Sequence, residues 1–202
     1  MTLPQPVQRL TPEQYLRHES DSAVRHEYYH GEVFAMAGGS PDHSLITANV
    51  CGELRARLKG TPCRVYESNL RVRVRRTTLY TYPDVTVLCG ERQFDPLDVN
   101  CETVVNPSLI VEVLSPSTES WDRGGKFQNY RQIESLREYV LVSSDKPLVE
   151  TFLRQGDGTW IYDPAAGPEA TAALNSLGVQ LPLAEVYAGA ELPKEPVGGP
   201  ES

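Results

Sequence analysis

The sequence predicts an α/β (α+β) protein in which helices flank a mixed central β-sheet. The run from Leu109 to Leu114 is almost continuously apolar and lies between Pro107 and Pro116, as in a strand covered on both faces. A polar segment suited to a helix follows, and Tyr139 to Val142 forms a second apolar run. A strand, a helix and a strand in this order indicate parallel neighbouring strands joined by a crossover.

Length and composition indicate one globular domain. The chain has 202 residues, of which 40% are hydrophobic and 23% charged, so it can fill one core and is short for two. Its net charge of −8 argues against wholesale attraction to nucleic acid or anionic membrane, although a local basic face stays open. No signal peptide and no bilayer-spanning apolar run is evident, so we expect a cytoplasmic protein without a membrane partner.

Composition also sets the expected domain limits and the state of the cysteines. We expect residues 1–10 to be a flexible arm, residues 11–187 a single domain, and the Pro/Gly/Glu-rich residues 188–202 a disordered tail. The four cysteines show no C-x-x-C pairing, which disfavours a cysteine zinc site. Disulfides stay open as an alternative, but we expect reduced cysteines in a cytosolic protein.

Cap signatures predict two helices in the first third of the chain. Thr11 and Pro12 open a short helix as N-cap and first helical residue. The triplet at 40–42, Ser-Pro-Asp, repeats this signature and opens the longest helix, which runs to about Lys59 with an apolar residue at every fourth position. Between the two helices, short strands flank Gly31.

Alternating residues predict a hairpin from Cys63 to Arg76, with its turn near Ser68-Asn69. Arg71, Arg73 and Arg75 alternate with valines, so their three guanidinium groups would share one face. Two interpretations stay open for this face. It is either the solvated outer side of an edge strand or a rim that contacts nucleic-acid phosphates.

The remaining elements follow from apolar runs and turn residues. We expect a strand over 82–88, then an irregular acidic loop over 89–105 that could reach over a site. After the strand at 109–114 we expect a helix over about 122–135, a hairpin formed by 149–154 and 160–162, and a last strand or helical turn at 181–187.

Three side chains could carry chemistry. Asp84 begins one strand, Glu112 lies inside the next, and Lys126 lies on the following helix, on the same face as Asp122. A carboxylate in a buried strand is costly unless a metal, a lysine or several donors meet it. Two carboxylates on neighbouring strands can share Mg²⁺, which takes one or two carboxylates and keeps several waters. The alternative is that Asp84 caps a strand and Glu112 merely pairs with Lys126.

Six segments give this constellation a wider context: HEYYHGEV at 26–33, GSPDH at 39–43, YPDV at 82–85, PSLIVEVLSPST at 107–118, DRGGKFQNY at 122–130 and LREYVLV at 136–142. In this order they resemble the Uma family of endonucleases, within the PD-(D/E)XK restriction-endonuclease-like superfamily. The resemblance covers about residues 11 to 187. It implies a restriction-endonuclease-like core, Mg²⁺ or Mn²⁺ held by Asp84 and Glu112, DNA as substrate, and a homodimer.

One position departs from the superfamily pattern. The third catalytic residue would be a lysine two positions after Glu112, and that position is Leu114. The Uma-type pattern instead takes a lysine from the next helix, which implies Lys126 as the third catalytic residue.

The resemblance also implies supporting residues. Glu32 and His43 match the family pattern and are candidates for completing the pocket. Ser115 and Asp122 are candidates for holding the metal ligands in place. For Tyr130 and Tyr139 we expect core positions. His43 has the competing interpretation of an exposed or capping histidine.

We therefore expect a divalent-metal-dependent endonuclease that hydrolyses phosphodiester bonds in DNA. Two alternatives are a non-catalytic nucleic-acid- or protein-binding module that keeps the nuclease fold, and a hydrolase of small phosphate esters. The acidic net charge favours the alternatives, whereas the arginine face favours nucleic acid.

Overall fold

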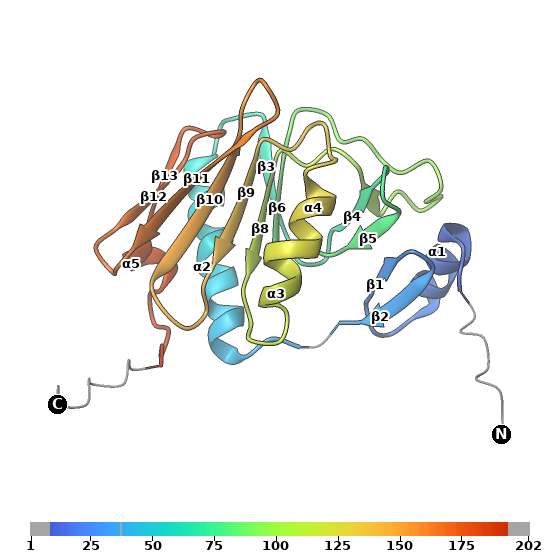
Figure 1. Cartoon of the computed structure of the whole chain (residues 1–202), viewed down its shortest axis with the longest axis horizontal. Helices are drawn as coiled ribbons and strands as arrows, with labels where there is room; N and C mark the ends of the chain where they lie inside the picture. Colours follow the sequence, from blue (N-terminus) through green and yellow to red (C-terminus); the bar gives the residue numbers. More distant parts are fainter. Residues whose placement is uncertain (1–8, 37, 194–202) are drawn as a thin grey trace.

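The computed structural model describes residues 9–36 and 38–193, which form two β-sheets, a separate strand pair and flanking helices (Figure 1). The main sheet has the strand order β11-β10-β9-β8-β6-β3, and the second sheet has the order β2-β1-β5-β4-β7. The strands of the main sheet are β3 (Cys63–Glu67), β6 (Val85–Cys89), β8 (Leu109–Val113), β9 (Glu138–Val142), β10 (Leu148–Arg154) and β11 (Trp160–Ala166).

The strands of the second sheet are β1 (His26–Tyr29), β2 (Glu32–Ala35), β4 (Arg71–Val74), β5 (Leu79–Thr81) and β7 (Thr103–Val104). The separate pair is β12 (Thr171–Leu174) with β13 (Val179–Pro182). The helices are α1 (Pro12–Asp21), α2 (Pro41–Arg57), α3 (Glu119–Trp121), the π-helical turn η1 (Asp122–Lys126), α4 (Phe127–Tyr130) and α5 (Leu183–Val186). None of the helices within these described residues is both long and apolar enough to cross a membrane.

The centre of the main sheet has the predicted neighbours. Strand β8 pairs antiparallel with β6 and parallel with β9. The segment α3–η1–α4 connects the two parallel strands and lies in front of the sheet in Figure 1, while α2 lies behind it. The predicted strand-helix-strand unit is confirmed.

The alternation of side chains along β8 decides where Glu112 lies. Val111 and Val113 pack with Ile46 of α2 in one core cluster, whereas Ile110 packs with Tyr130 of α4 in another. Successive strand residues point to opposite faces of a sheet. Glu112 therefore lies on the face covered by the crossover segment.

Local cap chemistry places α1 and α2 where the sequence predicts them. The Thr11 hydroxyl accepts the Gln14 backbone N–H while the Gln14 side chain accepts that of Thr11, which is a complete capping box. The Ser40 hydroxyl accepts the backbone N–H of His43 at 3.1 Å. This cap fixes the first turn of α2 and, with it, the position of His43.

The predicted hairpin over 63–76 is wrong. Strand β3 pairs with β6 of the main sheet, while β4 pairs with β5 and β7 of the second sheet. A turn in which Leu70 donates to the Glu67 carbonyl at 3.1 Å carries the chain from one sheet to the other. Val72 and Val74 are fully buried in the core behind the crossover segment, and this burial holds β4 away from β3.

The crossover helix is shorter than predicted and contains a wide turn. The helix ends at Tyr130 instead of near 135, and Asp122–Lys126 form a π-helical turn. Such turns are rare and recur at functional sites. Both ends of this turn, Asp122 and Lys126, are buried.

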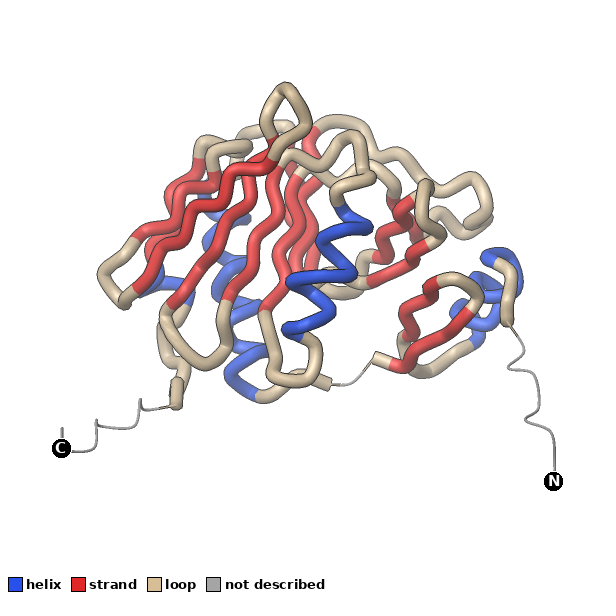
Figure 2. The backbone as a smooth tube through the Cα atoms, viewed as in Figure 1, coloured by secondary structure: helices blue, strands red, loops and turns tan. Residues whose placement is uncertain are grey.

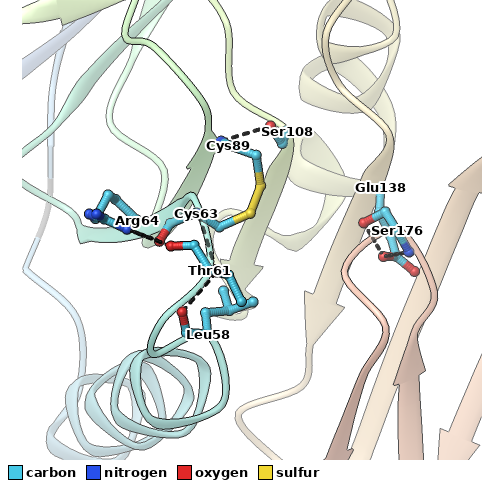
Figure 3. The surroundings of a disulfide bond; sticks show 8 residues. All are labelled: Leu58, Thr61, Cys63, Arg64, Cys89, Ser108, Glu138 and Ser176. Atoms are coloured by element: carbon cyan, nitrogen blue, oxygen red, sulfur yellow. Dashed lines mark hydrogen bonds between the residues drawn. A yellow bond between two sulfur atoms is a disulfide. The ribbon is translucent and has the colours of Figure 1, made fainter.

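The pairing of β3 with β6 also overturns the expectation of reduced cysteines at two positions. Cys63 lies directly opposite Cys89 in the register, and the two form a disulfide (Figure 3). Cys51 and Cys101 are free. The sequence offered no local signal for the pair because the partners are 26 residues apart.

The expected terminal segments lie largely outside the described residues. Residues 1–8 of the predicted arm and 194–202 of the predicted tail are among those not described. Within the described part, Leu10 donates its backbone N–H to the Gly31 carbonyl at 2.9 Å. The Glu191 backbone N–H donates to Asp42 at the start of α2, at 3.0 Å. Leu10 and Glu191, just outside the predicted limits 11–187, thus contact residues inside them.

Candidate active site

A cavity of about 570 Å³ opens between the crossover segment, the start of α2 and the β1–β2 hairpin. Asp84, Glu112 and Lys126 all line it, together with His43 and Ser115. Figure 2 shows the crossover helix in front of the main sheet, with the short strands of the second sheet to its right. Residues that are far apart in the chain thus meet at one place.

Two hydrogen bonds from backbone N–H groups connect Asp84 with Glu112 and its neighbour Val113 on β8. The Asp84 backbone N–H donates to Oε2 of Glu112 at 3.4 Å, and the Val113 backbone N–H donates to Oδ2 of Asp84 at 2.7 Å. The pairing of β6 with β8 creates this exchange, because Val85 lies opposite Val111. The two carboxylates therefore face the same cavity from adjacent strands.

Lys126 reaches this pair from the π-helical turn. Its Nζ lies 3.2 Å from Oε1 of Glu112, 3.2 Å from Oδ1 of Asp122 and 3.1 Å from Oε1 of Glu27. The superfamily pattern places a lysine two residues after Glu112. In this chain the lysine beside Glu112 comes from the next helix instead. Leu114, at the original position, is buried in the core.

Glu27 is a site residue that the sequence analysis missed. Besides contacting Lys126, its Oε1 accepts a hydrogen bond from the hydroxyl of Thr81. Glu32, the predicted candidate from the same segment, lies on β2 with a side chain that is 45% exposed, and it pairs with Arg9 outside the cavity. Strand alternation offered a signal: Tyr28 is buried in a core cluster, so Glu27 and Tyr29 share the opposite face.

His43 is part of the site. Its Nε2 lies 3.5 Å from Oδ2 of Asp84, and the hydrogen bond to Asp84 raises the pKa of the imidazole against the opposing effect of burial. Gly39 provides the space for this ring, because a Cβ there would lie 2.6 Å from Nδ1 of His43. The His43 side chain is 17% exposed and lies beside Asp84 in the lining of the cavity.

Ser115 and Asp122 also line the cavity. The Ser115 hydroxyl lies 3.1 Å from that of Ser117 and 3.0 Å from that of Thr118, so it organises the loop before α3. Asp122 is buried and contacts the ammonium of Lys126. Tyr139, buried as predicted, donates its hydroxyl to the Asp122 carbonyl at 3.0 Å.

Tyr130 is buried as expected but is also a donor to the site. Its hydroxyl donates to Oε1 of Glu112 at 2.7 Å, the same oxygen that Lys126 contacts. One oxygen of Glu112 is thus held by Tyr130 and Lys126. The other, Oε2, receives only the long hydrogen bond from Asp84.

Burial dominates the electrostatics of the pair formed by Glu112 and Lys126. Burial raises the pKa of Glu112 to about 8, with Asp122 and Asp84 adding to the rise and Lys126 opposing it. For Lys126, burial acts to lower the pKa, but the carboxylates of Glu112, Glu27 and Asp122 outweigh it and hold the pKa well above its ordinary value. The carboxylates around Lys126 therefore favour its charged form, and burial favours the protonated form of Glu112.

The three arginines form neither of the two faces left open by the sequence, a solvated edge or a rim open to phosphates. The Arg71 side chain is buried and donates to Thr103, Tyr82 and Asp98. A buried guanidinium needs this set of partners, and it is not free for a phosphate.

Arg73 likewise pairs with Asp95, and Arg75 alone of the three is exposed. Asp95 and Asp98 belong to the acidic loop 89–105. All residues of this loop are described, and none lines the cavity. The loop packs on the second sheet. It does not reach over the site, although the sequence had left that possibility open.

The residues present fit a divalent cation. Carboxylate oxygens from Asp84 and Glu112 are the hard ligands that Mg²⁺ and Mn²⁺ prefer, and such ions need only one or two carboxylates when waters complete the shell. Oε2 of Glu112 receives only one long hydrogen bond, so it can bind a ligand. The open cavity leaves room for the waters.

A second group of potential ligands lies elsewhere. Atoms of His18, Glu19 and His26 lie within 4.8 Å of one another, and none of these residues lines the cavity. The Glu19 carboxylate already accepts bonds from the His26 ring at 3.0 Å and from the Tyr82 hydroxyl at 2.9 Å. These bonds give Glu19 a structural role in tying α1 to β1.

Comparison with known proteins places the chain in a family. The family model Uma2, described as "Putative restriction endonuclease", matches residues 12–184. The chain belongs to the Uma2 family. It is 36% identical over 185 residues to the uncharacterized protein slr1290 of Synechocystis sp. (strain PCC 6803), covering 91% of this chain and 94% of that protein. A second protein of that organism, sll1609, is 34% identical over 161 residues, covering 80% of this chain and 90% of the relative.

A solved structure supports the fold assignment. The crystal structure of a "putative nuclease belonging to DUF820" from Anabaena variabilis superposes with a TM-score of 0.70 at 17% identity, covering 89% of this chain and 98% of that one. The predicted restriction-endonuclease-like fold of this Uma2 protein, with its mixed sheet flanked by helices, is confirmed.

Proposed function

We propose that this Uma2 protein is a divalent-metal-dependent endonuclease that hydrolyses phosphodiester bonds in DNA. The observation that carries the proposal is the convergence of Asp84, Glu112 and Lys126 on one open cavity, from two adjacent strands and the helix after them. Membership in a family described as restriction endonucleases agrees with it.

Each residue has a role that follows from its contacts. Asp84 and Glu112 would hold Mg²⁺ or Mn²⁺, which supplies a water of lowered pKa and neutralises phosphate charge when bound. Lys126 keeps its charge at neutral pH, so it can stabilise negative charge that develops on the phosphate. Tyr130 and Asp122 hold Glu112 and Lys126 in place. His43, next to Asp84, can exchange a proton at the cavity wall.

Plasmid nicking tests the proposal. Supercoiled DNA should be nicked in Mg²⁺ or Mn²⁺, and Asp84→Asn, Glu112→Gln and Lys126→Met should each abolish the nicking. Glu169→Gln, at an exposed position in the turn between β11 and β12, is the control and should cleave like the wild type. Intact plasmid under every metal would reject the nuclease proposal and favour a binding module that keeps the fold.

A small phosphate ester is the second candidate substrate. The cavity favours it in one respect, since Lys126 is the single Lys or Arg among the described residues that line the cavity. Release of nitrophenol from a nitrophenyl phosphate, with plasmid left intact, would assign that activity instead.

The homodimer and the cytoplasmic location stay predictions. Proteins with this fold often cut the two strands as dimers, and two-fold symmetric dimers are the commonest assembly. Light scattering over a range of protein concentrations checks the dimer.

A further inference from the structure

One wall of the cavity is aromatic. Tyr29, Phe34 and Trp121 line the same cavity as the carboxylates and Lys126. Phe34 is 50% exposed and Trp121 is 36% exposed, which is unusual for large apolar side chains beside a charged site. The indole of Trp121 contacts the ring of Tyr29, with their centroids 5.6 Å apart. The wall thus offers an open aromatic surface next to the candidate catalytic groups.

The position of Trp121 depends on a glycine one turn later. A Cβ added to Gly125 would lie 1.8 Å from the indole of Trp121, so a side chain there would displace the ring. A Cβ at the neighbouring Gly124 would meet nothing within 4 Å. Only one of two adjacent glycines therefore supports the ring.

We propose that this aromatic wall binds an unstacked nucleobase, so that the preferred substrate is DNA with unpaired nucleotides. The inference rests on the proposed nuclease function, which places a phosphate at the carboxylates. The base attached to that nucleotide then lies beside Trp121 and Phe34. Aromatic side chains bind bases by stacking, without regard to sequence, because every base has a π-face.

Charge and size favour a single unpaired nucleotide over a duplex. Duplex binding relies on many Lys and Arg contacts to phosphates, whereas this chain has a net charge of −8 and a cavity lining with one lysine among its described residues. A cavity of about 570 Å³ suits a small ligand or a single residue of a chain. A base already outside a stack also avoids the cost of unstacking.

Fluorescence tests the proposal directly. The chain has two tryptophans, so Trp160→Phe leaves Trp121 as the sole indole. This variant is titrated in Ca²⁺ with a short single-stranded oligothymidine and, separately, with the same sequence in a blunt duplex. We expect the single strand to quench Trp121 emission at about tenfold lower concentration than the duplex, the difference expected for one stacked base.

Two glycine variants in the same background supply matched controls. Gly125→Ala should weaken single-strand binding about tenfold, and Gly124→Ala should leave it unchanged. Trp121→Phe should retain most of the single-strand preference in plasmid and oligonucleotide cleavage, and Trp121→Ala should lose it. Thermal melting of each variant separates loss of binding from loss of folding.

The outcomes separate this inference from the nuclease proposal. Nicking that depends on Asp84, with equal quenching by duplex and single strand, would overturn the base subsite and leave the nuclease intact. Quenching by the single strand without any nicking would support the subsite and reject hydrolysis. Trp121 emission that changes with protein concentration alone would show that a second copy covers the wall, and it would overturn the inference.

Discussion

The ammonium of Lys126 lies 3.2 Å from Oε1 of Glu112, although the residues are 14 positions apart and lie on different elements. Glu112 is fixed in β8, a strand whose five residues are all buried, and Lys126 is carried over it by a π-helical turn. Removing Lys126 would leave the buried carboxyl groups of Glu112 and Asp122 without the cation that lies between them, which is destabilising, whereas removing Glu112 leaves Lys126 with Glu27 and Asp122. The pair is therefore structural as well as a candidate for catalysis.

Metal should stabilise the protein. An ion that binds only the folded site at about a hundredfold excess over its Kd adds roughly 2.7 kcal/mol, which corresponds to about 5–10 °C in Tm for a chain of this length. Asp84→Asn should remove the response while Asn keeps an acceptor for the Val113 N–H. Differential scanning fluorimetry across a Mg²⁺ or Mn²⁺ titration measures it, with Glu169→Gln as control. An equal rise in the Tm of Asp84→Asn would show that the ion binds at another site.

Metal affinity should rise with pH. Because burial raises the pKa of Glu112 to about 8, the ion must displace a proton below that pH, and its affinity should increase up to tenfold per pH unit as pH approaches 8. Calorimetric titration with Mn²⁺ at several pH values checks this. A pH-independent affinity would show that Glu112 is already ionised.

The Glu112 carboxyl group also makes the folding stability of the metal-free protein depend on pH, and its raised pKa fixes the direction of the change. The folded state holds the Glu112 proton more tightly than the unfolded chain, whose glutamate pKa is about 4.5. Folding stability should therefore fall as pH rises from about 4.5 to about 8. Urea unfolding at several pH values measures it, and Glu112→Gln should remove this contribution.

Glu27 should matter to activity and Glu32 should not. Glu27 is one of three carboxylates around Lys126, whereas Glu32 faces solvent and Arg9. Glu27→Gln should slow nicking at least tenfold, about 1.4 kcal/mol of transition-state stabilisation, because the ammonium loses a partner that positions it. Glu32→Gln is the matched control from the same hairpin. Equal rates for the two variants would contradict a role for Glu27.

Reduction of the Cys63–Cys89 disulfide should destabilise the fold without affecting the site. For a loop closed over a separation of 26 residues, the chain-entropy model gives about 3.5 kcal/mol. Urea unfolding of Cys63→Ser, with Cys101→Ser as the control for a free cysteine, measures the loss. Neither bonded cysteine lines the cavity, so nicking below the melting temperature should be unchanged. Wild-type stability in Cys63→Ser would show that the bond contributes nothing.

Local signals in the sequence determined much of the fold. The cap residues Thr11 and Ser40 set where α1 and α2 begin, because a cap acts on backbone groups within its own turn. The continuous apolar run around Glu112 marked the central strand, since only a strand buried on both faces needs one. That strand, together with the segments that resemble the Uma family, also identified Asp84 and Lys126 as residues of the same cavity.

Only the tertiary structure decided which groups meet across long separations. Arg71 and Arg73 alternate like a solvated edge, yet the aspartates of a distant loop bind them. Cys63 begins a strand without any local signal for a partner, and strand pairing alone places it opposite Cys89. Glu27 and Glu32 are both glutamates of one short hairpin. They differ in role because Lys126 contacts Glu27. A sequence pattern records the preferences of neighbouring residues, whereas these contacts depend on the free energy of packing whole elements together.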